Sequence, residues 1–137
     1  MKGARSRLQA AGYFEEVVGE IFDGLDLSTL STRVVRFKRC SFVGTDLRHA
    51  TFDGCWFTTC DLGRADLRAA SLRGALIRGC DLRGADLSDS DLTDATIGFP
   101  KPASTVTDLT GVILKGAVLT GAVFQNVDGV TFTDLWM

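Results

Sequence analysis

The sequence has little of what most enzymes, membrane proteins and nucleic-acid-binding proteins require. It holds one histidine, His49, and two prolines in 137 residues. A single histidine argues against a catalytic or metal site built from histidines. No apolar run approaches the roughly 18–20 residues that span a bilayer. No apolar segment follows the basic N-terminus either, so we expect neither a membrane span nor a signal peptide. Lysine and arginine number 15 against 17 aspartates and glutamates, which argues against direct nucleic-acid binding.

The rest of the composition is that of an ordinary globular domain. Apolar residues make up 45% of the chain and charged residues 23%, with a net charge of −2. Disorder is therefore not expected, because apolar residues are plentiful and the net charge is small. The length predicts a single domain.

The dominant feature is a repeat with a period of five residues. A large apolar residue, here called the centre of each unit, recurs at every fifth position from Phe22 to Ile97, and Thr32 interrupts the series. The residue two before the centre is usually small, as in the run ADLRA, ASLRG, ALIRG, CDLRG. An α-helix would spread such centres around its whole surface, and an extended strand would send them to alternate faces. The chain must therefore turn a corner every five residues.

Four sides of five residues close a square coil of twenty, and coils stack at the strand spacing of about 4.8 Å. The units resemble the pentapeptide-repeat family, whose A/C-D-L-x-x pattern they match over about residues 20–98 and again over 107–126. The resemblance implies an all-β fold, a right-handed quadrilateral β-helix of about five coils. We also expect a short helix that caps its N-terminal end.

This organisation divides the chain into five segments. They are an N-terminal cap (1–19), the pentapeptide-repeat β-helix (20–98), a proline-containing loop (99–106), a final coil (107–126) and a C-terminal cap or dimerisation segment (127–137). Proline cannot donate to a ladder, so the loop should bulge from one corner. Its extra residues place Leu109 above Leu82 and Phe124 above Ile97. If the five-residue register shifts by three more residues, Phe132 is the next centre after Phe124.

The four cysteines leave three interpretations open. Cys40, Cys60 and Cys80 share one inward column, and Cys55 lies on another side. They are buried free thiols, or column neighbours form a disulfide, or they bind a metal. We favour free thiols, because alanine, serine and threonine fill the same slot elsewhere. We accordingly expect no metal, no cofactor, no catalytic residue and a reducing, cytoplasmic location.

Function is then expected on the outer faces, where two sides stand out. The residue before each centre points outward, and on the second side these residues form a candidate acidic interaction face: Asp26, Asp46, Asp66 and Asp86. This line is either a solvated face on which Arg48 and Arg68 pair with the aspartates, or a surface that imitates the charge of a DNA backbone.

The fourth side combines an aromatic residue with cations. Its candidate protein-contact patch comprises Arg36, Lys38, Trp56, Leu76 and Arg78. Arginine stems could stack on the tryptophan, the patch could anchor a protein partner, or it could bind nucleic acid, which the low overall charge disfavours.

The C-terminus ends in three large apolar residues. Leu135, Trp136 and Met137 are an unusual exposed tail for a monomer. We expect them to form a dimer contact, so the chain would be a homodimer through its C-terminal end.

Some pentapeptide-repeat proteins, the Qnr-type quinolone-resistance proteins, resemble duplex DNA and protect DNA gyrase or topoisomerase IV. This chain is similar to them in its repeat, its aromatic-rich early coils and its apolar C-terminus, but it is shorter and less acidic. The resemblance implies a non-enzymatic protein that binds gyrase or topoisomerase as a DNA mimic and confers protection. The alternative is a general protein-interaction scaffold, and no residue constellation supports an enzyme.

Overall fold

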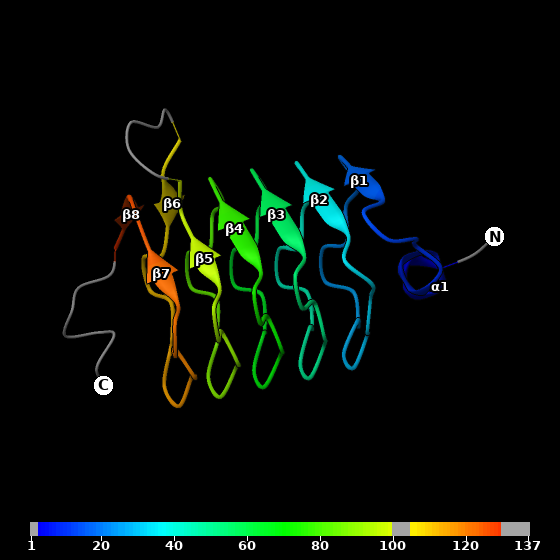
Figure 1. Cartoon of the computed structure of the whole chain (residues 1–137). Helices are drawn as coiled ribbons and strands as arrows, with labels where there is room; N and C mark the ends of the chain where they lie inside the picture. Colours follow the sequence, from blue (N-terminus) through cyan, green and yellow to red (C-terminus); the bar gives the residue numbers. More distant parts are fainter. Residues whose placement is uncertain (1–2, 100–104, 130–137) are drawn as a thin grey trace.

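The computed structural model describes residues 3–99 and 105–129. The chain winds into a β-solenoid whose strands stack along one axis, and a short helix lies at its N-terminal end (Figure 1). The elements are α1 (Ala4–Gln9), β1 (Glu16–Val18), β2 (Arg36–Lys38), β3 (Trp56–Thr58), β4 (Leu76–Arg78), β5 (Thr96–Ile97), β6 (Thr107–Asp108), β7 (Val123–Phe124) and β8 (Val127–Asp128).

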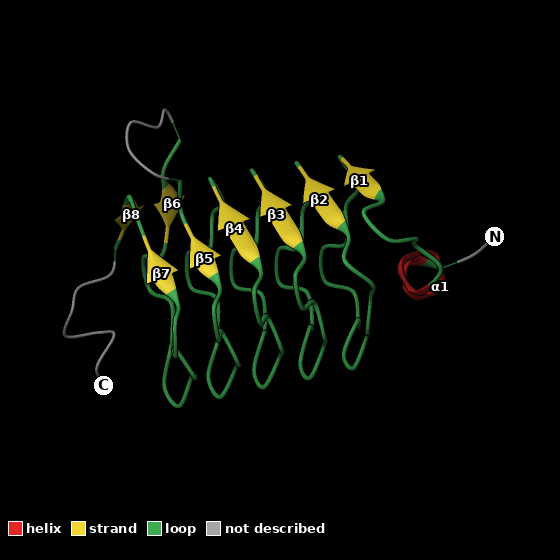
Figure 2. Ribbon diagram, viewed as in Figure 1, coloured by secondary structure: helices red, strands yellow, loops and turns green. Residues whose placement is uncertain are grey.

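One side of the solenoid is a parallel sheet of six strands in the order β1-β2-β3-β4-β5-β7. From β1 to β5, neighbouring strands pair with an offset of twenty residues, for example Arg36 with Trp56 and Trp56 with Leu76, and β5 pairs with β7 at an offset of twenty-seven because the loop lies between them. Isolated parallel bridges connect the other sides with the same two offsets, twenty residues before the loop and twenty-seven across it. Turns fill much of the remaining chain (Figure 2), because each side is only a few residues long. The twenty-residue coil and the quadrilateral β-helix are thus confirmed.

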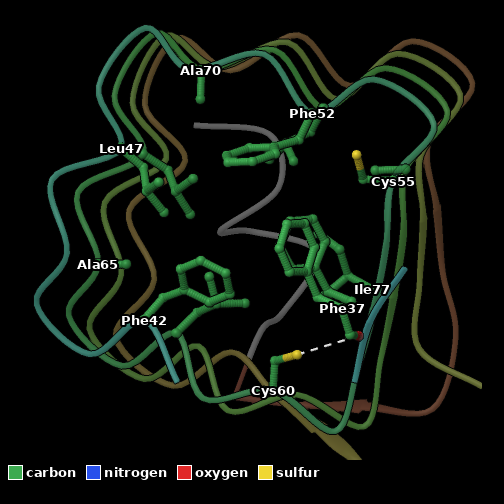
Figure 3. Close-up of a cluster of buried hydrophobic side chains, with 14 of the residues drawn as sticks. Phe37, Phe42, Leu47, Phe52, Cys55, Cys60, Ala65, Ala70 and Ile77 are labelled. Carbon is green, nitrogen blue, oxygen red and sulfur yellow. Dashed lines mark hydrogen bonds between the residues drawn. The ribbon is translucent and has the colours of Figure 1, made fainter. Parts of the chain in front are cut away.

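The large centre residues fill the interior. All fifteen apolar centres between Phe22 and Ile97 are buried, and those of successive sides point toward a common axis (Figure 3). The early coils stack phenylalanines: the rings of Phe22 and Phe42 lie 4.9 Å apart, and those of Phe37 and Phe57 lie 5.0 Å apart. One coil cannot bury its centres alone, so stability comes from contacts between neighbouring coils.

Most corners share one backbone conformation. The residue two after the centre has a positive φ, as at Gly24 (67°), Thr29 (63°) and Ala69 (58°). The next N–H donates back to the carbonyl of the centre, as from Ala70 to Leu67 at 3.0 Å. This is the arrangement of a type II turn, which favours glycine at the third position. The stack holds other residue types in the same strained conformation.

Three of the four cysteines, Cys40, Cys60 and Cys80, occupy corners that lack this hydrogen bond. In the described chain, no N–H three residues on closes the corner after Phe37 or Phe57. Instead, the Cys60 thiol donates to the Phe37 carbonyl at 3.5 Å (Figure 3), and the Cys80 thiol donates to Phe57 at 3.2 Å. Each thiol therefore satisfies a carbonyl of the preceding coil.

Cys55 supports the irregular corner after Thr32 in a similar way. Its sulfur accepts the N–H of Val35 at 3.5 Å. All four cysteines are buried and free, which confirms the interpretation as structural thiols. The hydrogen bond with Cys40 lowers the pKa of Cys60, but the contact with Cys80 and burial outweigh it and raise that pKa to about 12. A thiol with so high a pKa is a poor nucleophile.

The chain returns to register after the loop. Asp81 bridges to Asp108, and Ile97 pairs with Phe124, which confirms that Leu109 follows Leu82 in the stack. The final coil extends past residue 126, because β8 pairs with β6 in the same twenty-residue register. Phe132, for which a second slip was expected, lies outside the described residues.

The N-terminal boundary is corrected by the structure. The helix covers only Ala4–Gln9, and Glu16–Val18 pairs with Arg36–Lys38 as the first strand of the sheet. Val17 is fully buried and is stacked beneath Phe37. The expected cap of residues 1–19 therefore contains the start of the solenoid, and Leu8 and Ala11 close the end of its core.

Candidate functional site

The four aspartates Asp26, Asp46, Asp66 and Asp86, here the acidic column, stand in register on one side of the solenoid. Arg48 donates from Nε and Nη2 to Asp46 at 2.9 and 2.8 Å. Arg68 pairs with Asp66 in the same bidentate way at 2.9 and 2.7 Å. Hydrogen bonds from these arginines lower the pKa of both carboxyls. The middle of the column is therefore a line of neutralised pairs.

These carboxylates also hold the backbone. The carboxylate of Asp46 accepts the N–H of Arg48 at 3.1 Å, and that of Asp86 accepts the N–H of Ser88 at 2.9 Å. Where serine replaces aspartate, as at Ser41, a carboxylate of the preceding coil takes over: Asp23 accepts the N–H of Val43 at 2.8 Å. The repeated aspartates thus have a structural role on every coil, independent of any partner.

Acid should weaken this network between about pH 4 and pH 2. Hydrogen bonds from the Thr93 side chain and N–H, and then from Arg73, lower the pKa of Asp91 from 3.8 to about 2. A lowered pKa in the folded chain stabilises it fully above the unfolded value, and this stabilisation is lost as pH falls through the folded value. The urea concentration at the unfolding midpoint should be measured from pH 7 to pH 2. We expect it to decrease once the pH is below about 4, and to decrease less in Asp91→Asn than in wild type. A flat wild-type profile would contradict the assignment.

The second candidate surface, here the Trp56 patch, comprises Arg36, Lys38, Trp56, Leu76 and Arg78 on the outer face of β2, β3 and β4. Trp56 is 42% exposed and lies between Arg36 and Leu76 on adjacent strands. Within the described residues, the only cations over aromatic rings are Arg33 over Tyr13 and Arg78 over Phe99. No guanidinium group therefore lies over the indole ring of Trp56 in this part of the chain.

The arginines of the patch are directed elsewhere. Arg36 donates from Nε to the carbonyl of Phe14 at 3.0 Å and lies 3.9 Å from Glu16. Arg78 lies under the ring of Phe99, 5.6 Å from its centroid. Neither guanidinium group lies over Trp56, whose side chain remains partly exposed on the sheet.

Features that would indicate catalysis or metal binding are few. His49 is an exposed corner residue with a φ of 59°. A hollow of about 340 Å³ lies outside the first side, lined by Val43, Asp61, Gly63, Arg64, Asp81 and Arg83. Two of these residues, Asp81 and Arg83, form an ion pair at 2.7 Å. Residues 3–99 and 105–129 hold no metal-binding group of three or more His, Cys, Asp or Glu side chains, and no helix there has the length and apolar character to cross a bilayer.

The expected dimer contact, Leu135, Trp136 and Met137, lies outside the described residues. Several outward positions of the last described coil are apolar. Ile113 and Val118 are 47% and 45% exposed, in positions that Asp86 and Asp91 hold one coil earlier. The sequence offers no sign of this change before the coil register is known. The homodimer remains a prediction, and the exposed Ile113 and Val118 side chains are compatible with it.

Comparisons with known proteins agree with this architecture. The family model described as "Pentapeptide repeat region" matches residues 31–99, and "Pentapeptide repeats (8 copies)" matches residues 107–128. A solenoid built from five-residue units is the class of protein that the fold defines. The chain belongs to the pentapeptide-repeat family. No curated protein matches the sequence.

Solved structures are known that resemble this chain in fold. QnrB1, a plasmid-mediated fluoroquinolone resistance protein, is 24% identical with a TM-score of 0.53, over 86% of this chain and 65% of its own. A pentapeptide repeat protein from the thylakoid lumen of Arabidopsis thaliana is 21% identical with a TM-score of 0.46, over 98% of this chain and 79% of its own. This chain thus spans about two thirds of the length of QnrB1, and the likeness concerns the fold.

Proposed function

We propose that this chain is a non-enzymatic protein that binds another protein through the Trp56 patch. The observation that supports this most is a partly exposed tryptophan on the sheet side of the solenoid, with no guanidinium group of the described residues over its ring. Tryptophan is the residue type most enriched at binding hot spots. Parallel strands hold it in place, so little ordering is needed on binding. The free thiols favour a cytoplasmic location.

Replacing Trp56 with alanine tests this function. The unfolding free energy should stay within about 1 kcal/mol of wild type, as for an exposed site, while capture of the partner from a lysate of the source cells should be lost. Thr58→Ala, on the same strand, is the matched control and should retain capture. A large loss of stability would show that Trp56 is needed for packing, and undiminished capture would assign binding to another surface.

A second candidate is binding to DNA gyrase or topoisomerase IV as a DNA mimic, with protection against quinolones. It is favoured by the in-register carboxylates of the acidic column and by the fold shared with QnrB1. The bidentate arginines at Asp46 and Asp66 count against it, because they cancel the charge that would attract a DNA-binding groove. The geometry therefore supports the Trp56 patch better.

The combined replacement Asp46→Asn, Asp66→Asn and Asp86→Asn tests the mimic. If the acidic column is the binding surface, this variant should lose inhibition of gyrase supercoiling and any rescue from a fluoroquinolone. Asparagine keeps the side-chain oxygen that accepts the backbone N–H, so the fold should survive. An active variant would rule out mimicry by this column. Wild-type protein without effect at tens of micromolar would rule out gyrase as its target.

A further inference from the structure

Three cations without an ion pair gather around Trp56. On the other sides several arginines pair with aspartates of their own or a neighbouring coil, as Arg48, Arg68 and Arg83 do, and the other cations without an ion pair in the described residues, Arg33, Arg64 and Lys115, are spread over the rest of the chain. Beside Trp56, in contrast, Lys38 and Arg39 are exposed. Neither forms an ion pair with any residue in 3–99 or 105–129, and the same is true of Arg78.

These cations lie close to the indole ring. Lys38 ends the strand beside β3, about 4.8 Å away, and is displaced along it by two residues from Arg36, the direct neighbour of Trp56. Arg39 follows at the corner with a φ of 51°. Arg78 lies on the strand beyond, next to Leu76. Glu16, at the edge of the sheet, is 3.9 Å from Arg36 and lies two strands from Trp56.

A chain with a net charge of −2 thus presents a local positive field around an exposed apolar anchor. We propose that the Trp56 patch binds an acidic, extended protein segment, which places an aromatic or large aliphatic side chain on Trp56 and Leu76 and carboxylates near Lys38, Arg39 and Arg78. This inference rests on the proposed function and adds the chemistry of the partner.

An acidic segment fits better than nucleic acid. Nucleic-acid binders of ordinary affinity neutralise roughly 6–10 phosphates, and three unpaired cations do not provide that number. The overall negative charge would also repel a long polyanion. A short segment needs only two or three carboxylates and one apolar anchor. Because five side chains form a small interface, we expect an affinity on the order of ten micromolar.

Selection from a random 12-residue peptide library displayed on phage tests this without knowledge of the partner. The full chain is the bait at 50 mM salt, and enriched peptides are then measured individually by fluorescence anisotropy. We expect enriched sequences to combine Asp or Glu with Phe, Trp or Leu. Their affinity should fall at least tenfold in Trp56→Ala, at least tenfold in the combined Lys38→Gln, Arg39→Gln and Arg78→Gln variant, and severalfold at 500 mM salt. Thr58→Ala should bind as wild type.

Each other result has a distinct meaning. If the enriched peptides are neutral or basic and need Trp56 but not the three cations, the proposal that the partner segment is acidic is wrong, and the proposed function still holds. Peptides that bind Trp56→Ala equally well would contradict both. If no peptide is enriched, the proposal that the partner is an extended segment is wrong. Capture from the lysate then tests whether the partner is a folded protein. Tighter binding of a fluorescent 20-nucleotide oligo-dT, lost in the triple glutamine variant, would replace the acidic segment with nucleic acid.

Discussion

Replacing Phe42 with alanine is expected to lower the unfolding free energy by about 3–5 kcal/mol, the usual cost of emptying a buried phenylalanine site. Its ring packs against three other phenylalanines: centroids lie 4.9 Å from Phe22, 5.3 Å from Phe37 and 6.0 Å from Phe57. The neighbours are held by backbone ladders and cannot collapse into the space. Since domains are stable by only about 5–15 kcal/mol, this single change should remove much of the total.

Urea unfolding followed by circular dichroism measures this effect. Ile21→Ala is the matched control, because Ile21 adjoins Phe22 in sequence but points outward and is 72% exposed. Its replacement should change the free energy by no more than about 0.5 kcal/mol. Similar values for the two variants would mean that the phenylalanine stack does not carry the stability of the early coils.

Replacing Gly98 with alanine should loosen the final coil. Gly98 directly follows β5 and has a φ of 100°, and an added Cβ would collide with the backbone carbonyl oxygen of Gln125. That contact lies where the final coil docks, since the N–H of Gln125 donates to Ile97 at 2.9 Å. Two backbones cannot both stay in place, so we expect a loss of about 3 kcal/mol or more.

Hydrogen exchange of the amides of Ile113, Val118 and Val123, which donate to the preceding coil, localises this effect. Gly74→Ala is the matched control: Gly74 has a φ of 66° and no heavy atom would approach its Cβ within 4 Å. It should cost only about 1 kcal/mol and leave the final coil protected. Equal exchange in the two variants would show that the final coil does not depend on close packing at Gly98.

The period of five makes most of the fold predictable. Once corners are required every fifth residue, the twenty-residue columns follow, and they place Leu109 and Phe124 correctly after the loop. The start of the solenoid is harder to recognise, although Val17 lies five residues before Phe22. Glu15 and Glu20 occupy the small-residue positions there and conceal the repeat. Charges are tolerated at this end because Arg7, from the capping helix, pairs with both glutamates at 2.8 and 3.1 Å.

The candidate surfaces are less predictable than the core. The register alone places outward residues in columns, so the acidic column and the Trp56 patch can be named from the sequence. The partner of each side chain depends on neighbouring segments. Arg36 turns from Trp56 toward Phe14 and Glu16, and Arg78 turns toward Phe99. Neither contact follows from a five-residue repeat, because one partner lies before the expected repeat and the other at its exit.

The most direct test of the account compares the two candidate faces in one experiment. Tagged wild type, Trp56→Ala and the Asp46, Asp66 and Asp86 triple asparagine variant are used to capture proteins from the same lysate, and the captured proteins are quantified by mass spectrometry. We predict a partner that the triple variant retains and that Trp56→Ala loses at least tenfold. A partner retained by Trp56→Ala and lost by the triple variant would contradict the account and assign function to the acidic column.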